Sequence, residues 1–414
     1  MDFPKGILVL SVFFLFYIVL QIFLFLRLKD FLYGRLHHDG RRKLIYGLAA
    51  SFFIITIFPV AGHIFFKWDF HEHYPMAGRI LFTAFAVWAF GSGGCAVILA
   101  ASDFYRRLVG RFHPRPVPVD TRRREFLKRG LGLAAAAPFV VSGYGVIRSR
   151  HRFQVDYLDL PVNGLSSALS NLSIVHLSDI HSGPFMPGEE IAEYVEATNR
   201  LQPDLVALTG DFVTISREEV YPCVDTLAGL KAKYGVYACL GNHDVFAGAE
   251  EELTRLFRQR GIHVLRNEAT SVGIGNSRLN ILGIEDILWG DFDLAKAVKA
   301  SQKEPGEVQL LLSHRPEVFP SAAKMGIDLV LSGHYHGGQI KLTPYPESLS
   351  IARLITPYAD GMFHLSRNDH SPGTADAKDA NLFVTRGVGI TGLPIRINCP
   401  PQIAHLSLVP SHKV

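Results

Sequence analysis

The chain has 414 residues, of which 48% are hydrophobic, and its formal net charge is only +4 at pH 7. This length predicts two to three domains and argues against a single compact core, and the mean hydropathy of +0.18 reflects apolar residues gathered in the first third. The sequence has no nucleic-acid-binding feature, and its four widely spaced cysteines include no C-x-x-C pair, which argues against a disulfide framework.

Residues 1–150 contain four apolar runs without charged side chains, at residues 6–26, 44–66, 80–102 and 130–147. A helix needs about 20 apolar residues to cross about 30 Å of hydrocarbon. The first three runs meet this length and the fourth is shorter. A buried helix of a soluble protein is the alternative for any single run, but three long runs in succession favour a membrane. We therefore predict that this region consists of transmembrane helices.

The basic residues indicate how these helices are oriented. They are dense between the first and second runs and between the third and fourth, whereas the middle loop has only Lys67 and Arg79. Positively charged loops stay on the cytoplasmic side of a membrane. The N-terminus and the domain at residues 151–414 are therefore predicted to be extracytoplasmic.

Residues 122–147 resemble a bacterial twin-arginine export signal, because Arg123 and Arg124 precede the apolar stretch 131–141. The alternative is the basic flank of an ordinary last membrane helix, and both interpretations give the same topology. The sequence leaves open whether this segment is used for export or cleaved. With the loop charges, it predicts a protein integral to the bacterial inner membrane.

After residue 150, short apolar strands alternate with segments of helical periodicity. Strands are predicted at residues 173–177, 205–209, 236–240, 279–282, 309–313 and 329–331. Helices are predicted at residues 188–202, 217–233, 249–260, 291–301 and 316–325. Several strands are continuous apolar runs, as expected of strands buried on both faces of a sheet. This alternation predicts an α/β domain.

Polar side chains that can bind metal follow the predicted strands. They are Asp179, His181, Asp211, Asn242, His314, His334 and His336, with His243 and Asp244 beside Asn242. Open α/β sheets build their sites at the carboxyl ends of strands, so we expect these groups to converge. Two neighbouring divalent ions require anionic oxygen between them, which Asp211 can supply. Imidazole, amide and carboxylate ligands without thiolate suit catalytic Mn²⁺, Fe²⁺ or Zn²⁺ better than structural zinc.

Five sequence blocks carry a family resemblance. They are Ser178-Asp179-Ile180-His181, Gly210-Asp211, Gly241-Asn242-His243-Asp244, Ser313-His314 and Gly333-His334-Tyr335-His336. In this order they resemble the signature of calcineurin-like metallophosphoesterases, and the double glycine Gly337-Gly338 is similar to the membrane-associated bacterial branch of YkuE- and YaeI-type enzymes. The resemblance extends over about residues 154–409. It implies a four-layer sandwich of two mixed β-sheets flanked by helices.

The resemblance also implies roles for these residues. It assigns the first metal to Asp179, His181 and His336, the second to Asn242, His314 and His334, and the bridge to Asp211. His243 is expected to contact the phosphate and protonate the leaving oxygen, with Asp244 fixing its orientation. Asn242 is also expected at the substrate, and Arg315 is a candidate phosphate contact because it follows His314. A surface ion pair is the alternative for Arg315.

The expected function is hydrolysis of a phosphoester, with a phosphodiester favoured, by attack of metal-bound hydroxide in a membrane-anchored enzyme with two divalent ions. The alternatives are a phosphomonoesterase or pyrophosphatase acting on a nucleotide-linked lipid, and a non-catalytic membrane receptor that retains the fold. Expected partners are the lipid bilayer and a phosphoester from a lipid or the cell wall. The sequence leaves open the natural substrate, the metal, the oligomeric state and the role of the first three helices.

Overall fold

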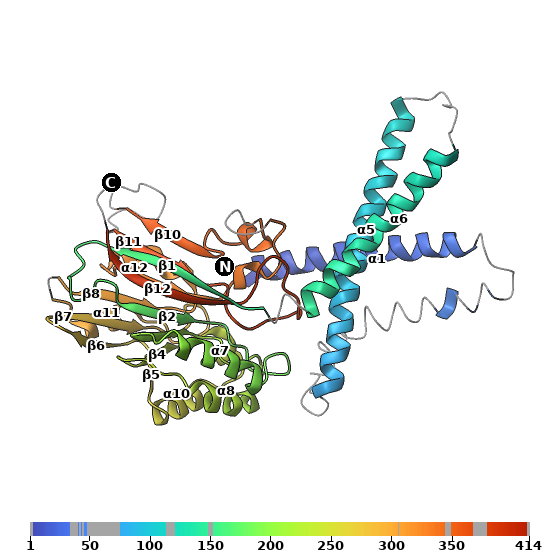
Figure 1. Cartoon of the computed structure of the whole chain (residues 1–414). Helices are drawn as coiled ribbons and strands as arrows, with labels where there is room; N and C mark the ends of the chain where they lie inside the picture. The colour runs from blue at the N-terminus through green and yellow to red at the C-terminus, as the bar shows by residue number, and fades with distance from the viewer. Residues whose placement is uncertain are drawn as a thin grey trace. The chain divides into compact units, whose positions relative to one another are not determined.

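The structure is a computed structural model that describes residues 3–33, 40, 43, 45–47, 75–112, 121–147, 152–304, 306–343, 349–366 and 379–411. The chain divides into two compact units, Met1–Arg148 and Ser149–Val414 (Figure 1).

Within its described residues, the N-terminal unit contains three long helices, which are α1 (Phe3–Tyr33), α5 (Pro75–Phe112) and α6 (Thr121–Ile147). They include the first, third and fourth predicted apolar runs. The second run, at residues 44–66, lies outside the described residues except for residues 45–47. Among the described residues, two helical segments are long and apolar enough to cross a membrane, Gly78–Phe112 and Thr121–Ile147.

Small residues allow α5 and α6 to approach closely. A Cβ added at Gly91 would lie 2.2 Å from the ring of Phe139, and one at Gly94 would lie 2.7 Å from Pro138. Close approach at small residues is the usual way in which helices pack in lipid, where burial of apolar surface between helices gains little.

The C-terminal unit is built on two six-stranded sheets. The first has the strand order β1-β12-β2-β3-β4-β5 and the second has the order β10-β11-β9-β8-β7-β6. The strands of the first sheet are β1 (Gln154–Val162), β2 (Ser173–Leu177), β3 (Leu205–Thr209), β4 (Val236–Cys239), β5 (Ile262–Val264) and β12 (Gln402–Pro410). Those of the second are β6 (Glu268–Ile274), β7 (Ser277–Gly283), β8 (Val308–Leu312), β9 (Leu329–Ser332), β10 (Gly361–Leu365) and β11 (Ala380–Val384).

Both sheets are mixed, with parallel strands at their centres. Strands β2 to β5 run parallel, whereas β12 pairs antiparallel with β2 and parallel with β1. Strands β7, β8, β9 and β11 also run parallel, and the outer strands β6 and β10 are antiparallel to their neighbours. The carboxyl ends of β2, β3 and β4 therefore share one edge of the first sheet, as those of β8 and β9 share one edge of the second.

Helices cover the outer face of each sheet. The longer ones are α7 (Gly188–Arg200), α8 (Val220–Leu227), α10 (Glu250–Gln259), α11 (Leu294–Ser301) and α12 (Phe319–Lys324). Buried side chains of α7, α8 and α10 share one apolar cluster with strands of the first sheet, along which Figure 1 shows these helices. Those of α11 and α12 share another with the second sheet. A third cluster joins the two sheets. The predicted four-layer α/β sandwich is thus confirmed.

One buried histidine lies inside this sandwich. His176 in β2 is fully buried, and its Nε2 is 2.7 Å from Thr209 Oγ1. Burial lowers the pKa of this imidazole to about 3. The folded protein therefore holds the ring neutral at pH values where the unfolded chain binds a proton, so this group reduces stability as the pH falls from about 6.5 towards 3.

We expect His176→Gln to reduce this acid sensitivity, because the neutral amide can still hydrogen-bond to Thr209. Between pH 7 and pH 5, the free energy of unfolding should fall by about 2 kcal/mol less in the variant than in the wild type. Pulse proteolysis in urea, with metal chelated from both proteins, measures this difference. Equal losses in the two proteins would show that His176 does not contribute to the acid sensitivity.

Candidate metal centre

The predicted ligands lie on turns that directly follow parallel strands. Asp179 and His181 follow β2, Asp211 follows β3, and Asn242 begins the short helix α9 (Asn242–Phe246) after β4. In the second sheet, His314 follows β8, and His334 and His336 follow β9. The shared sheet edges therefore bring residues together that are as far as 157 positions apart in the sequence.

The backbone of these turns is unusual. Asp179, His181, Asp211, His334 and His336 all have positive φ angles, of 55°, 48°, 55°, 76° and 50°. Left-handed backbone is unfavourable for residues other than glycine and gathers at functional sites, where the surrounding structure imposes it. Here five predicted ligands adopt it in one place, which turns their side chains towards one another.

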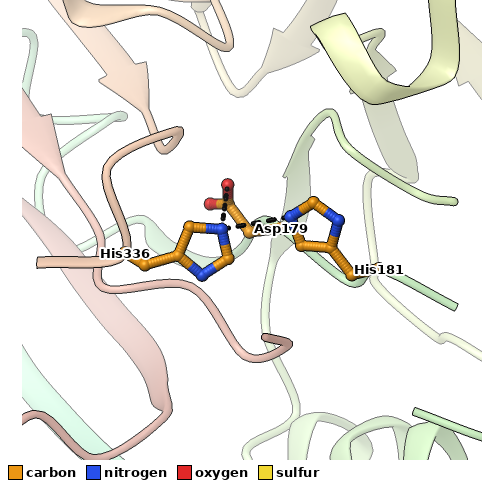
Figure 2. A group of neighbouring side chains, drawn as sticks. All are labelled: Asp179, His181 and His336. Atoms are coloured by element: carbon orange, nitrogen blue, oxygen red, sulfur yellow. Dashed lines mark hydrogen bonds and ion pairs between the residues drawn. The ribbon is translucent and has the colours of Figure 1, made fainter. Parts of the chain in front are cut away.

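Figure 2 shows the first group of predicted ligands, Asp179, His181 and His336. The Nε2 atoms of the two imidazoles are 3.1 Å apart, and His336 Nε2 is 3.3 Å from Asp179 Oδ1. One potential ligand atom from each side chain lies within 4.8 Å of the others. All three side chains are buried. The ring of His181 turns its Nε2 towards this group. Its Nδ1 has no hydrogen-bond partner among the described residues.

Asp211, His314 and His334 form a second group. His314 Nε2 is 3.0 Å from Asp211 Oδ2 and 3.2 Å from His334 Nδ1. The other ring nitrogen of His314 lies 2.7 Å from the carbonyl oxygen of Thr209, which fixes the orientation of the imidazole. Asp211 Oδ2 is also 3.6 Å from Nε2 of His181. The carboxylate of Asp211 therefore lies between the two groups, where a bridging ligand would have to be.

Burial and charge set the protonation of these groups in the absence of metal. Burial lowers the pKa of His181 to about 3 and the pKa values of His334 and His336 well below their usual range. Neutral imidazole is the form that binds metal. Burial alone would raise the pKa of Asp211, but the positive charge of His314 holds it well below its usual value. Conversely, the Asp211 carboxylate overcomes burial and raises the pKa of His314 to about 10.

His243 lies beside the two groups and is only partly buried. Its main-chain N–H donates to Asp211 Oδ1 at 2.8 Å, and its ring packs edge-on against that of His181 with centroids 4.7 Å apart. Its Nδ1 lies 2.5 Å from the carbonyl oxygen of Thr214. Since that nitrogen is the donor, Nε2 is the atom that can exchange a proton at the site.

The structure corrects the role expected for Asp244. Its carboxylate does not orient the ring of His243 but accepts main-chain N–H bonds of 2.8–3.2 Å from Gly241, Asp211, Phe212 and Val213. Successive residues on a helix point about 100° apart, so neighbours on α9 cannot face each other. Asp244 therefore holds the Asp211 loop in place, and Thr214 orients the imidazole.

Arg315 is neither exposed nor simply a surface partner. It is buried, and its Nε donates to Asp286 Oδ2 at 2.8 Å. Nη1 lies 2.6 Å from Nε2 of His334, and Nη2 donates to Asn242 Oδ1 at 3.2 Å. The expected ion pair thus exists inside the protein, and the guanidinium group lies against two predicted ligands of the second metal.

Arg396 lies in the closing sequence Leu393-Pro394-Ile395-Arg396, whose position favours packing beside the site over contact with substrate. It is fully buried beside the first group. Its guanidinium donates to the carbonyl oxygens of Arg386, Gly387, Gly389 and Cys399 and lies 3.3 Å from Nδ1 of His336. It therefore holds the closing segment against the ligands. The signal in the sequence is a charged residue between apolar neighbours in Pro394-Ile395-Arg396-Ile397.

Gly333 allows Asp179 to take its position. A Cβ added there would lie 2.1 Å from Ser178 Oγ and 2.3 Å from Asp179 Oδ2. We expect Gly333→Ala to displace this carboxylate and weaken metal binding by about 10- to 100-fold, as loss of a supporting contact does at other metal sites. The control is Gly273→Ala in β6, where an added Cβ meets open space. Metal titration of both variants tests this, and unchanged affinity in Gly333→Ala would contradict it.

The comparisons with known proteins agree with this geometry. The sequence profile named calcineurin-like phosphoesterase matches residues 172–338, which contain all the predicted ligands. An uncharacterized metallophosphoesterase of Helicobacter pylori is 31% identical over 297 residues, covering 70% of this chain and 72% of that protein. The chain belongs to the calcineurin-like metallophosphoesterases. Members of this family are metal-dependent phosphoester hydrolases with a dinuclear centre of divalent ions.

Two further metallophosphoesterase relatives bear on the branch of the family. YkuE of Bacillus subtilis is 27% identical over 299 residues, covering 69% of this chain and 97% of YkuE, which confirms the resemblance noted from the sequence. A zebrafish (Danio rerio) protein named transmembrane protein with metallophosphoesterase domain is 28% identical over 288 residues, covering 67% of this chain. The match spans 62% of the zebrafish protein.

The residues present fit the dinuclear centre of this metallophosphoesterase family. Two separate groups supply imidazole and carboxylate donors, each with its potential ligand atoms within 4.8 Å of one another. Asp211 lies between the two groups. Asn242 adds an amide oxygen, and the guanidinium group of Arg315 contacts both this oxygen and the ring of His334. The assignment of each side chain to one metal remains a prediction.

Proposed function

We propose that this chain is a membrane-anchored phosphodiesterase that depends on two divalent ions, Mn²⁺, Fe²⁺ or Zn²⁺. The position of Asp211 is the main support, since its carboxylate lies 3.0 Å from His314 Nε2 in one group and 3.6 Å from His181 Nε2 in the other. Two such ions, when bound, lower the pKa of a water molecule and neutralise charge on the phosphoryl oxygens.

The residues around the ligands have separate tasks in this reaction. His243 holds a proton on Nε2 and gives it to the leaving oxygen, since its Nδ1 is occupied by Thr214. Asp244 keeps the Asp211 loop rigid through four main-chain N–H bonds. Arg315 positions Asn242 and His334. Prearranged groups of this kind reduce the cost of reaching the transition state.

The charges at the site favour a diester over a monoester. Two guanidinium groups border the ligands, and both are already engaged. Arg315 is paired with Asp286, and Arg396 donates to four main-chain carbonyl groups. The two ions would meet the phosphoryl oxygens of either ester, but a monoester carries a second negative charge, for which these engaged guanidinium groups are not placed, whereas a diester carries only one. The site therefore suits the smaller charge.

Membrane attachment rests on the N-terminal unit. Two described helices are long and apolar enough to cross a membrane, and a relative is named as a transmembrane protein. We extend the proposal to the bacterial inner membrane with the hydrolase domain extracytoplasmic, because the basic loops alternate accordingly. The partners would then be the bilayer and a phosphoester of a lipid or of the cell wall.

The function is tested with the purified full chain and Mn²⁺ against bis(p-nitrophenyl) phosphate and p-nitrophenyl phosphate. We expect kcat/KM for the diester to exceed that for the monoester at least about tenfold, and a chelator to abolish both reactions. Activity on monoesters or pyrophosphates alone would support those alternatives. A metal-loaded protein that is inert towards the diester, the monoester and inorganic pyrophosphate would support the receptor.

A further inference from the structure

Two exposed aromatic residues lie next to His243. Phe246 is 51% exposed and Trp289 is 44% exposed. The ring centroid of Phe246 is 5.6 Å from that of His243 and 5.1 Å from that of Trp289, which it meets edge-on at 76°. We call Phe246 and Trp289 the aromatic pair. It extends outward from the one residue of the site that is expected to protonate the leaving group.

The loop that carries Trp289 is firmly held. The buried carboxylate of Asp286 accepts the main-chain N–H groups of Leu288 and Trp289, both at 3.0 Å, and its other oxygen accepts from Arg315 at 2.8 Å. Gly290 N donates to the carbonyl oxygen of Asp286 at 2.9 Å. The same Arg315 lies against His334. The exposed indole is therefore carried by a loop that Asp286 holds, and Asp286 is linked through Arg315 to the predicted ligand His334.

We propose that the aromatic pair binds the hydrocarbon part of the leaving group of a lipid phosphoester. This inference rests on the proposed function, in which water adds its oxygen to phosphorus as the bond from phosphorus to the leaving oxygen breaks. His243 gives its proton to that oxygen, and the water loses a proton to solvent. The leaving group must then lie on the side of His243, where the ring of Phe246 packs against His243 and that of Trp289 packs against Phe246.

The chemistry of the surface favours a hydrocarbon over a nucleobase. Bases are recognised by hydrogen bonds to their edges as well as by stacking, whereas the side chains of the aromatic pair contain an indole N–H as their single polar group. In the same loop, Leu288 and Phe292 are 49% and 40% exposed and add apolar surface, and the exposed Asp291 and Asp293 flank Phe292. Apolar surface that a lipid covers gains the free energy of transfer from water. The same chain carries two helices apolar enough to cross a membrane, where lipids are the substrates at hand.

The fluorescence of Trp289 can report binding at the aromatic pair. The chain has three tryptophans, and the other two are Trp68 and Trp88 in the N-terminal region. In a Trp68→Phe/Trp88→Phe background, the fluorescence of Trp289 can be followed in the full chain, loaded with Zn²⁺ and held in lipid nanodiscs. The ligands are the monomethyl esters of ethyl-, butyl- and hexylphosphonic acid, which carry one negative charge as a phosphodiester does and are named below by their alkyl group. We expect Kd to fall about 15-fold from ethyl to hexyl, about twofold for each half-buried methylene, with a blue shift of the emission for hexyl.

In Phe246→Ala, we expect Kd to fall only about threefold from ethyl to hexyl, in place of about 15-fold in the parent protein. The matched control is Tyr221→Ala in α8, which removes an aromatic side chain that is 52% exposed and should leave this ratio as in the parent protein. Equal affinity for the ethyl and hexyl ligands would overturn the inference but not the proposed function. Tighter binding of the corresponding phenylphosphonate ester than of the hexyl ligand would overturn the hydrocarbon assignment. Failure of every phosphonate to bind would overturn both proposals.

Discussion

Asp211→Asn is expected to lower the rate of phosphodiester hydrolysis about 10³-fold or more. The two ions together stabilise the charge of the transition state by several kcal/mol, and each loss of about 1.4 kcal/mol lowers the rate tenfold. The carboxylate lies between the two ligand groups, 3.0 Å from His314 and 3.6 Å from His181. An amide has the same shape but no negative charge to offset the repulsion of two cations. Elemental analysis should therefore find at most one ion per chain.

The matched control for this variant is Asp204→Asn. Asp204 is a partly buried carboxylate of the same unit that accepts from the main chain and hydroxyl of Ser173 at 2.9 Å, away from the ligands. It should retain two metal ions and full activity. If Asp211→Asn also retained two ions and its rate, the bridge would have to be another group and the support for the proposed function would be lost.

The strands that sequence patterns predicted are those at the centres of the two sheets. β2 and β3 have the predicted bounds because continuous apolar runs indicate strands buried on both faces. Edge strands gave no such signal. β1 is only partly buried, and it pairs with β12, nearly 250 residues later in the chain. No local pattern reveals a pairing over that separation.

Helix ends deviated where a single interaction stops or starts a helix. The helix predicted to begin at residue 291 begins at Leu294, because the side chain of Asp293 accepts from Lys296 N and caps it. The helix predicted to continue to residue 233 ends at Leu227, and the main chain of Lys231 donates instead to Asn199. That contact comes from another helix, so local periodicity could not reveal it.

The site was predictable in its residue types but not in its supporting contacts. Strand ends and side-chain chemistry singled out the side chains that the fold brings together, since both are local properties of the sequence. The orientation of His243 by Thr214 and the pairing of Arg315 with Asp286 join segments 29 residues apart in each case. Such contacts follow from how loops of neighbouring strands meet, which only the folded chain defines. The error about Asp244 has the same origin, because adjacency in sequence suggested a contact that helix geometry forbids.

His243→Ala is expected to lower kcat about 10²- to 10⁴-fold, the usual contribution of a general acid, while the chain keeps two metal ions. The loss should depend on the leaving group. The loss should be small when p-nitrophenolate leaves, because it needs no proton. It should be large when an alkyl alcohol leaves, because its oxygen must be protonated. Steady-state kinetics with both kinds of diester, together with elemental analysis, measure this difference.

The metal content of this variant decides between two roles, since a potential ligand atom of His243 lies within 4.8 Å of those of His181 and Asp211. Loss of an ion would make His243 a ligand and not the acid. Asp244→Asn provides the second comparison. If Asp244 oriented the ring, its variant would share the dependence on the leaving group. The four main-chain N–H groups around that carboxylate predict a different result, a less stable protein with a uniform loss of rate, because the Asp211 loop and not the imidazole loses its support.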